Sequence, residues 1–511
     1  MYAPARLESS QIVWGVSEAL DVLQLEHNEG LGYQGDLRLL FSACTDPRSA
    51  IRTLAMLPPD YRGAVTVVMN DDKTPNVSAR NVILLLMALI VEWAPESADE
   101  IVDCMIHVWY SALIRQKDLQ VLQYVRASIE YVWNGVEEEA PDESLDEFPS
   151  RQWHWRTGSK QLQVTLRKSA WLEVLTLLDI PADLTAEKAL DIRAEAMRDP
   201  VEANTRNAYM RLLTPSRRLA LHRFELDGIL LPFGSCRKDF DTPNPTLFRN
   251  GVWSVRTDIH PLYSWNSQEV ADTSTLGATE DVFGKLFYYL RKLLKSFVLR
   301  MLDVDVCFRL YNFDVEDVHR LLLSNEETFS RIDMGNVADE MKLGIRKTLG
   351  LAVAVLQKRD ENRHATIITL FTAAVRGADW AQDILASQGP RVQSFVHLAR
   401  NMAIPFAFDH RIDEPDMALS VLGDYDRHFD RYTEDQDRPF YKYETAFRVC
   451  MKEEHTIVEK WPHSSAKLQA DERGATTEFE RLLSRSWSSR YRYVEWEWEF
   501  QGQVMSPAFS S

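Results

Sequence analysis

The sequence predicts an α/β fold built on a mostly parallel sheet, and three short segments near the N-terminus carry this prediction. Residues 36–44 are a short apolar run that ends in turn-forming residues, which is typical of a buried strand. Residues 64–69 are a second apolar run, rich in β-branched side chains. Between the two runs, residues 48–57 place apolar side chains at helical spacing. This alternation favours parallel strands, because each helix returns the chain to the end of the sheet where the previous strand began, so that the next strand runs in the same direction.

Mostly helical structure is expected after these elements. Residues 77–93 are apolar on nearly all sides of a helix, so this helix should be sandwiched between other elements. Residues 98–135 are also expected to be helical, and the acidic stretch 137–148 should be an exposed connection. Residues 150–225 are expected to be mostly helical, including a segment at 159–178.

The second half of the chain combines loops with further strands. Residues 232–265 are loop-rich, and residues 281–300 have the pattern of an amphipathic helix. Strands are expected at 304–313, at 329–334, at 365–375 (where a helix start is the alternative), and as a terminal antiparallel pair of 455–461 with 491–500. The expected organisation is a first half of the core at 1–97, a helical insertion at 98–230, a loop-rich segment with the second half of the core at 231–400, and a C-terminal segment with the terminal strands at 401–511.

The composition limits the classes of protein to which the chain can belong. The chain has 511 residues, enough for two to four domains, with 45% hydrophobic and 26% charged residues. These values exclude a wholly disordered, collagen-like or disulfide-scaffold protein. Lys and Arg number 58 against 76 Asp and Glu, a formal net charge of −18. Such a surface repels nucleic acid as a whole, so any RNA contact requires a local basic patch.

Cysteine spacing and hydropathy predict a cytoplasmic protein. The N-terminal residues lack the basic start and apolar run of a secretory signal. The longest apolar run, 82–91, spans only about 15 Å as a helix, which is half of what a bilayer requires. The five cysteines are too far apart for a CxxC-type zinc site. We therefore expect reduced thiols, and neither a membrane contact, a zinc or other metal ion, nor a cofactor.

Several separated blocks of sequence resemble one family. They include Ser-Ala-Cys-Thr-Asp-Pro-Arg at 42–48, Gly-Ile-Leu-Leu-Pro-Phe-Gly at 228–234, Pro-Asn-Pro-Thr-Leu-Phe at 243–248 and Asn-Arg-His-Ala-Thr at 362–366. Together they resemble the domain-of-unknown-function family that fungal MYND-type zinc-finger morphogenesis proteins share with dynein axonemal assembly factors. The Cys/His finger of the fungal proteins is missing here, and Thr45 stands where the family has a glycine in its first turn.

This resemblance implies a fold and three candidate functions. The family core looks like a degenerate Rossmann-type, methyltransferase-like sheet. A similar fungal group without the finger, the arginine-containing cyclodipeptide synthases, joins arginine with a second amino acid into a diketopiperazine and draws on aminoacyl-tRNA. The first expectation is therefore such an enzyme of natural-product biosynthesis. The alternatives are a non-catalytic assembly scaffold and a small-molecule methyltransferase, the latter disfavoured because the first turn has no glycine to admit a ligand.

Candidate binding residues follow the first two predicted strands, because ligands of parallel sheets bind beyond the carboxyl ends of the strands. Asp46 and Arg48 follow the first strand, and Asp71 and Asp72 follow the second. A bound guanidinium requires free carboxylates, and the candidates are Asp71, Asp72, Asp333 and Asp339. The structural alternatives are that Asp46 caps a helix or forms an Asx turn, and that Arg48 forms an ion pair with Asp46 or Asp71.

Further candidates lie on the next helix and beyond a later strand. Arg80 opens the apolar helix and is expected to face the acidic turn before it, making the mouth rigid. Asn336 and Asp339 follow the strand predicted at 329–334 and should line the same mouth, as should Asp333. A solvated acidic rim is the alternative for the carboxylates.

Catalysis would require a base and an acyl acceptor. His364, which precedes an apolar run, is the candidate general base, and Asp46 is a further candidate catalytic group. Ser42 is the candidate acyl acceptor, since transfer from an aminoacyl ester uses a nucleophile. Burial at the end of a strand argues against Ser42 and equally against Cys44.

An RNA-binding element is expected on the helix at 281–300. Its basic residues are Lys285, Arg291, Lys292 and Lys295, interleaved with aromatic side chains. A basic stripe of this kind binds phosphates in an otherwise anionic protein. The alternative is an ordinary amphipathic helix with a solvated face.

Overall fold

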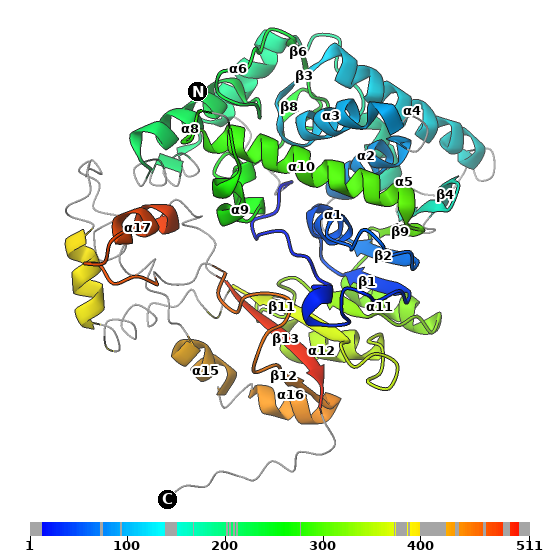
Figure 1. Ribbon diagram of the computed structural model, residues 1–511. Helices are drawn as coiled ribbons and strands as arrows, with labels where there is room; N and C mark the ends of the chain where they lie inside the picture. The colour runs from blue at the N-terminus through cyan, green and yellow to red at the C-terminus, as the bar shows by residue number, and fades with distance from the viewer. Residues whose placement is uncertain are drawn as a thin grey trace, which may run out of the picture.

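A single large sheet organises the molecule. The computed structural model describes residues 13–71, 75–91, 95–137, 151–166, 168–200, 213–275, 277–372, 389–398, 426–434, 439–462, 467–483 and 491–499, with a few isolated residues between these ranges. Within them, nine strands form one sheet in the order β12-β13-β11-β10-β1-β2-β9-β5-β4 (Figure 1).

The six central strands of this sheet are parallel to their neighbours, which confirms the predicted α/β class with a mostly parallel sheet. Their bounds are β11 (Thr366–Phe371), β10 (Arg331–Asp333), β1 (Leu37–Phe41), β2 (Val65–Asn70), β9 (Val306–Tyr311) and β5 (Lys160–Leu166). Antiparallel strands complete both edges: β4 (Arg151–Thr157) on one, and β13 (Arg492–Trp498) with β12 (Val449–Met451) on the other.

The chain reverses its direction of winding at β1. After β1 it forms the neighbouring β2, then β4 and β5 at the far edge, and then β9 in the gap between β2 and β5. It then returns to β10 on the other side of β1. The gap between the carboxyl ends of β1 and β10 is therefore a topological switch point, the place where open parallel sheets bind ligands.

Helices cover both faces of the sheet (Figure 1). Alternate residues of β1 point to opposite faces, so Leu39 and Phe41 join one apolar core while Leu40 joins the other. The first core contains α1 (Arg48–Ala55), α2 (Pro75–Ile90), α3 (Ala98–Tyr110) and α10 (Val282–Asp303). The second contains α11 (Val315–Ser324), α12 (Gly344–Ala354) and α16 (Phe440–Phe447).

Smaller elements surround this framework. The remaining helices are α4 (Gln116–Glu137), α5 (Lys168–Thr176), α6 (Ala186–Ala196), α8 (Pro215–Asp227), α9 (Ser267–Asp272), α15 (Asp426–Glu434), α17 (Ala475–Leu483) and the 3-10 turns η1 (Leu25–His27), η3 (Pro95–Ser97) and η4 (Pro261–Ser264). Short strands β3 (Leu113–Arg115) and β6 (Phe240–Pro243) pair with each other, as do β7 (Phe248–Arg249) and β8 (Val252–Trp253).

The expectation of helix over residues 159–178 was wrong in its first half. Residues 151–166 form the β4–β5 hairpin, and β5 joins the central sheet beside β9. Buried and half-buried residues alternate along β5, which is the period of a strand with one face in the core. The segment 98–230, expected to be a helical insertion, therefore contributes two strands to the central sheet.

The predicted terminal pair was also wrong in one partner. The β13 strand pairs with β11 and β12, and not with residues 455–461. Instead, this segment wraps around the buried carboxylate of Glu495: the amides of Ile457 and Val458 donate to Glu495 Oε1 at 2.8 and 2.9 Å. An alternating pattern marks a strand but does not choose its partner.

The described residues contain no single membrane-spanning helix and no metal-binding cluster. No single helix among them is both long and apolar enough to cross a bilayer, although residues 77–90 and 95–110, bent by 120° at their junction, pass that test as a pair. No group of three or more His, Cys, Asp or Glu in the same ranges is placed to hold a metal ion.

Candidate functional site

An open cleft of about 610 Å³ lies at the switch point. Thr45 reaches it from the turn after β1, Asp71 from the end of β2, and Asn336 from the turn after β10. The start of α11, which follows β9, completes the wall. Four carboxylates and two cations line the cleft: Asp71, Asp314, Glu316, Asp317, Arg320 and Lys342.

Contacts among these groups leave the lining acidic. Arg320 binds Glu316 at 3.0 Å and Asp317 at 2.8 Å, and Lys347 binds Glu316 at 3.2 Å from outside the cleft lining. Two cations thus face these two carboxylates, while Asp71 and Asp314 add two further negative charges. Lys342 Nζ donates to Asn336 Oδ1. Asp314 precedes the first residue of α11 without a side-chain hydrogen bond to that helix, and it is exposed. The cleft therefore has the charge expected of a binding site for a cationic or hydroxyl-bearing molecule.

Asp46 and Arg48 are turned away from this cleft and bind each other. Arg48 Nη1 and Asp46 Oδ1 form a close ion pair, and both side chains are buried. Asp46 Oδ2 also accepts the amide of Gly15 at 2.9 Å. Arg48 donates further to the hydroxyl of Ser17 at 3.1 Å and to its carbonyl at 3.2 Å. The ion-pair alternative for Arg48 is thus confirmed, and its partner is Asp46.

Arg80 does not face the acidic turn after β2. Its guanidinium is buried and donates to the carbonyls of Thr246 at 2.9 Å and Trp109 at 3.1 Å. Burial lowers the pKa of Arg80 to about 10, although Asp46 partly opposes this shift. Arg80 therefore joins α2 to the loop around β7 and to the end of α3. Asp72, the other acid expected there, lies outside the described residues.

The acids after β10 have separate roles. Asp333 Oδ1 accepts the amide of Gly335 at 2.9 Å, and burial raises the pKa of Asp333. Asp339 is buried and accepts the amide of Thr372 at 3.1 Å and its hydroxyl at 2.5 Å. Asp339 thereby ties the loop after β10 to the end of β11, whereas Asn336 lines the cleft.

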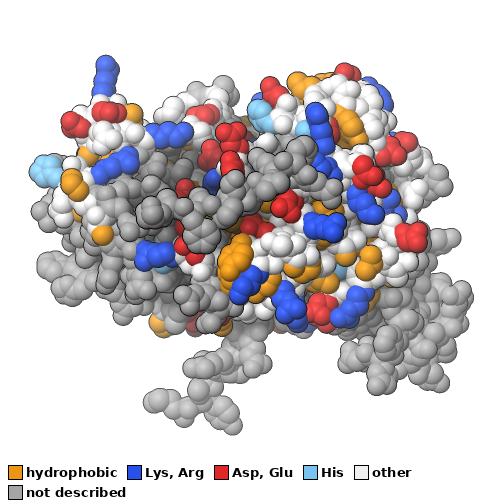
Figure 2. All heavy atoms as spheres, turned by 90° about the horizontal axis from the view of Figure 1, so that it is seen from below, with side chains coloured by type: hydrophobic (Ala, Val, Ile, Leu, Met, Phe, Trp, Pro, Cys, Tyr) orange, Lys and Arg blue, Asp and Glu red, His pale blue; other side chains and the backbone are white. Residues whose placement is uncertain are grey.

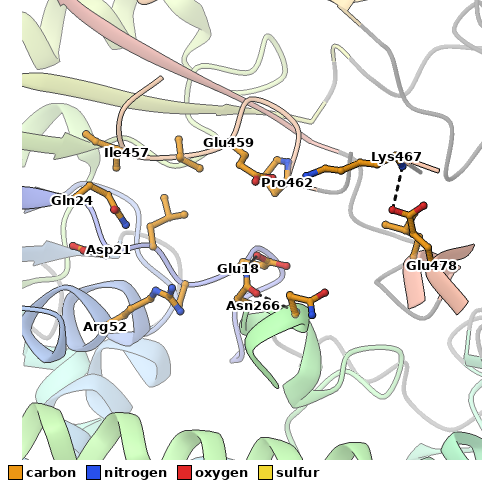
Figure 3. A pocket seen from close by; sticks show the side chains of 15 residues that line it. Glu18, Asp21, Gln24, Arg52, Asn266, Ile457, Glu459, Pro462, Lys467 and Glu478 are labelled. Atoms are coloured by element: carbon orange, nitrogen blue, oxygen red, sulfur yellow. Dashed lines mark hydrogen bonds between the residues drawn. The ribbon is translucent and has the colours of Figure 1, made fainter. Parts of the chain in front are cut away.

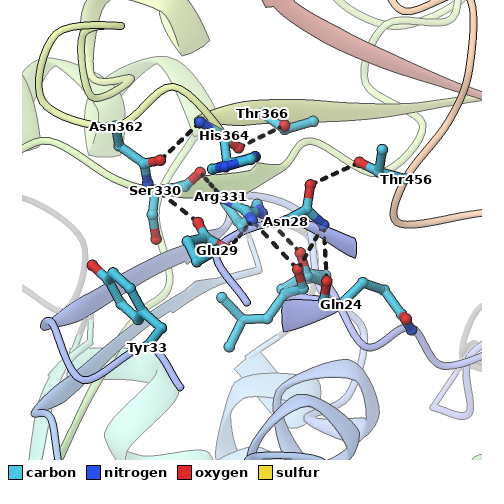
Figure 4. Close-up of polar contacts among 12 residues, drawn as sticks. Gln24, Asn28, Glu29, Tyr33, Ser330, Arg331, Asn362, His364, Thr366 and Thr456 are labelled. Atoms are coloured by element: carbon cyan, nitrogen blue, oxygen red, sulfur yellow. Dashed lines mark hydrogen bonds and ion pairs between the residues drawn. The ribbon is translucent and has the colours of Figure 1, made fainter. Parts of the chain in front are cut away.

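His364 lies at the opposite edge of the sheet. His364 precedes β11, at the amino end of that strand. The six residues of β11 separate His364 by about 20 Å from the carboxyl ends of the parallel strands, where the cleft lies. Its neighbourhood is a polar network around the buried Arg331, which binds Glu29 at 2.8 Å (Figure 4). His364 is thus remote from Ser42 and Asp46. Its Nε2 accepts a hydrogen bond from Arg363 Nε at 2.9 Å, and its amide donates to Asn362 Oδ1 at 2.8 Å.

A different histidine contacts Ser42, one that sequence reasoning missed. Ser42 Oγ lies 2.9 Å from His319 Nε2, and His319 Nδ1 lies 3.2 Å from the carbonyl of Leu351. Both side chains are 1% exposed. Burial lowers the pKa of His319 to about 4. A lone histidine on the buried face of a helix was the available signal, but nothing in the sequence relates position 319 to position 42.

The basic stripe of α10 is largely neutralised by α3. Arg291 binds Asp103 at 2.8 Å and Lys295 binds Asp99 at 2.9 Å. Lys285 Nζ donates to the carbonyl of Ala271. Lys292 is exposed. The aromatic side chains between them face the core, so α10 has the form of an amphipathic helix with a salt-bridged surface.

A second cavity, of about 310 Å³, lies between the N-terminal segment and the C-terminal loops (Figure 3). Its charged lining residues are Glu18, Asp21, Arg52, Glu459, Lys467 and Glu478. Arg52 is engaged by Glu269 at 2.6 Å and by Tyr289 at 2.7 Å. Glu478 accepts the amides of Lys467 and Leu468 at 3.2 and 3.0 Å. Internal contacts thus occupy several of its polar groups, unlike Asp314 in the switch-point cleft.

Comparison with known proteins identifies one family match. Residues 13–114 match the model of a family described as "Domain of unknown function (DUF4470)". The match begins at the segment that covers Arg48 and ends in β3, so it includes β1, β2 and the helices that follow them. No curated protein and no solved structure matches the chain. For this part of the chain, the expectation of a domain of unknown function is confirmed. The link to MYND-type morphogenesis proteins and dynein axonemal assembly factors stays a prediction, as does the cyclodipeptide synthase resemblance.

Proposed function

We propose that the chain is a tRNA-dependent cyclodipeptide synthase that joins arginine with a second amino acid, and that the switch-point cleft binds the arginine side chain. The acidic cleft carries this proposal. Its four carboxylates against two cations suit a guanidinium, whose fixed donors match carboxylate oxygens bidentately. Its volume of about 610 Å³ lies in the range of small-molecule sites.

The topology supports a Rossmann-like, methyltransferase-like interpretation of the sheet. The winding reverses at β1, and the antiparallel β13 is inserted between β11 and β12 near one edge. Methyl transfer itself is disfavoured, because the turn after β1 has no glycine and its Asp46 is bound internally to Arg48. The proposed reaction uses no cofactor and draws on cytoplasmic aminoacyl-tRNA.

Charged tRNA is the proposed partner, contacted through the exposed Lys292 of α10. Figure 2 shows the face on the side of α11 and α12, where basic and acidic side chains are intermingled. On α10 itself, Arg291 and Lys295 are bound by Asp103 and Asp99, so an RNA contact there would be local and few in charges, which predicts a shallow dependence of binding on salt.

The test is product formation by the full chain. Purified protein is incubated with arginine, tRNA, arginyl-tRNA synthetase, ATP, an amino-acid mixture and the synthetases for it, and the products are separated by mass. A cyclic dipeptide that contains arginine and disappears with ribonuclease is the expected result. Absence of such a product, with charged tRNA verified, would overturn the proposal.

A non-catalytic scaffold is the second candidate, and one observation favours it. Arg48 and Arg80, at the mouth predicted from sequence, are both bound by the protein's own groups. Calorimetric titration with arginine and with its neutral isostere citrulline separates the two functions. Binding of arginine over citrulline supports the enzyme, whereas binding of neither supports the scaffold.

A further inference from the structure

Ser42 and His319 form a contact that differs from those of two other buried hydroxyls in the sheet region. Ser330 Oγ donates to the carbonyl of Arg38 at 2.8 Å, and Thr348 Oγ1 donates to the carbonyl of Gly344 at 2.8 Å. Each of these hydroxyls binds backbone. Ser42 Oγ instead lies 2.9 Å from the imidazole nitrogen of His319.

The second nitrogen of His319 determines the direction of this hydrogen bond. A carbonyl oxygen accepts only, so His319 Nδ1, 3.2 Å from the carbonyl of Leu351, carries the ring proton. His319 Nε2 then has a lone pair and accepts the hydroxyl proton of Ser42. A serine that donates to an imidazole whose other nitrogen is held by a third group is the arrangement of an activated nucleophile.

The pair lies beneath the switch-point cleft. Ala43, the next residue after Ser42, lines the cleft, and so does Val315, which precedes His319 by one turn on the same face of α11. Both members of the pair are 1% exposed, so a reacting carbonyl could reach Ser42 only if the first turn of α11 moved away from the turn after β1.

We propose that Ser42 is the acyl acceptor and His319 the general base that activates it, with entry from the switch-point cleft. This inference rests on the proposed aminoacyl transfer and replaces His364 as the base. Ser42 Oγ attacks the ester carbonyl of the aminoacyl-tRNA, and its proton passes to His319 Nε2. The bond to the terminal ribose oxygen breaks, that oxygen takes the proton from His319, and the products are an acyl-serine and free tRNA.

The experiment uses a fluorophosphonate, which bonds to an activated serine with loss of fluoride and needs neither tRNA nor arginine. The folded full chain is treated with the probe and digested, and the modified peptide is identified by mass spectrometry. We expect the adduct on Ser42, its loss in Ser42→Ala, and at least a tenfold slower reaction in His319→Asn, where the amide keeps the contact with Leu351 but has no basic nitrogen.

Two matched variants serve as controls. Ser330→Ala removes another buried hydroxyl, and His364→Asn removes the other candidate base; neither should change the rate. An unmodified Ser42 in the folded wild-type protein would overturn the inference even if His319→Asn does not fold, and so would an unchanged rate in folded His319→Asn. A cyclic dipeptide made by Ser42→Ala would overturn this inference alone, whereas labelling of Ser42 without any cyclic dipeptide would count against the proposed function alone.

Discussion

The guanidinium of Arg48 lies directly against the α-carbon of Gly15. A methyl group on Gly15 would fall 1.5 Å from Arg48 Nη1 and 1.7 Å from Arg48 Cζ. The N-terminal segment thus crosses the buried Asp46–Arg48 pair at a glycine, the residue type that has no side chain to block this approach. This contact closes one side of the mouth after β1 and leaves the switch-point cleft on the other.

The glycine contact can be tested by substitution. Gly15→Ala should displace the Arg48 guanidinium from Asp46 and lower the free energy of unfolding by about 3 kcal/mol, because it adds a methyl group to a filled site and separates a buried ion pair. Urea unfolding measures this. Gly234→Ala, which would meet nothing within 4 Å, should change little. Equal stability of both variants would contradict the assigned contact.

Arginine recognition should depend on the carboxylates of the cleft. Asp314→Asn keeps the shape and removes one charge, so the Kd for arginine should rise about tenfold, as expected for loss of a charge-assisted hydrogen bond. Calorimetry provides the measurement, and citrulline affinity should not change. The exposed Asp360, before β11, offers a control in Asp360→Asn. If both Asn variants bind arginine like the wild type, the cleft is not the arginine site.

Acid should destabilise the fold through His319. Its folded pKa of about 4 is below the ordinary histidine value of 6.5, so the unfolded chain binds more protons between these values. The contribution of His319 to the free energy of unfolding is fully present above pH 6.5 and falls by about 3 kcal/mol as the pH decreases to 4. His319→Asn should make the unfolding free energy less dependent on pH over this window. His222→Asn, at an exposed position, should leave the slope as it is, and an identical slope in all three proteins would refute the assignment.

The C-terminal segment should depend on one buried carboxylate. Glu495 is fully buried, binds Lys452 Nζ at 3.0 Å and holds the loop at 455–461. Lys452→Met leaves this carboxylate without its cation and should cost about 3–5 kcal/mol. Thermal unfolding gives the value, with the exposed Lys442→Met as the control. A stable Lys452→Met variant would show that the amides alone suffice.

Binding of RNA by α10 should depend on Lys292 alone. Lys292→Glu should weaken tRNA binding and reduce the salt slope by about one unit, because one phosphate contact is lost. Lys238→Glu, another exposed lysine, makes the same change in net charge elsewhere. Filter binding at several salt concentrations distinguishes the two. Equal losses in both variants would mean that net charge, and not α10, controls the affinity.

Local pattern was sufficient for the centre of the sheet. The runs that became β1 and β2 are mostly apolar, as expected of strands covered on both faces, and the run that became β9 alternates buried with half-buried residues along most of its length. Their charged members, Arg38 and Arg309, are half-buried and both bind Glu327. The hairpin at 151–166 was missed because its alternating pattern lies next to a helix, and the partner of β13 was missed because alternation carries no information about pairing.

The sequence showed which residue types follow each strand, but it did not show which way their side chains point. Position after β1 marked Ser42, Asp46 and Arg48 as site candidates, since carboxyl ends of parallel strands meet at one edge. Packing across long sequence separations then decided that Arg48 turns toward Gly15 and Ser17, and that Ser42 meets His319 from a helix 277 positions away. Burial and hydrogen bonding depend on neighbours in space, so only the folded chain separates an internal ion pair from an open acidic cleft.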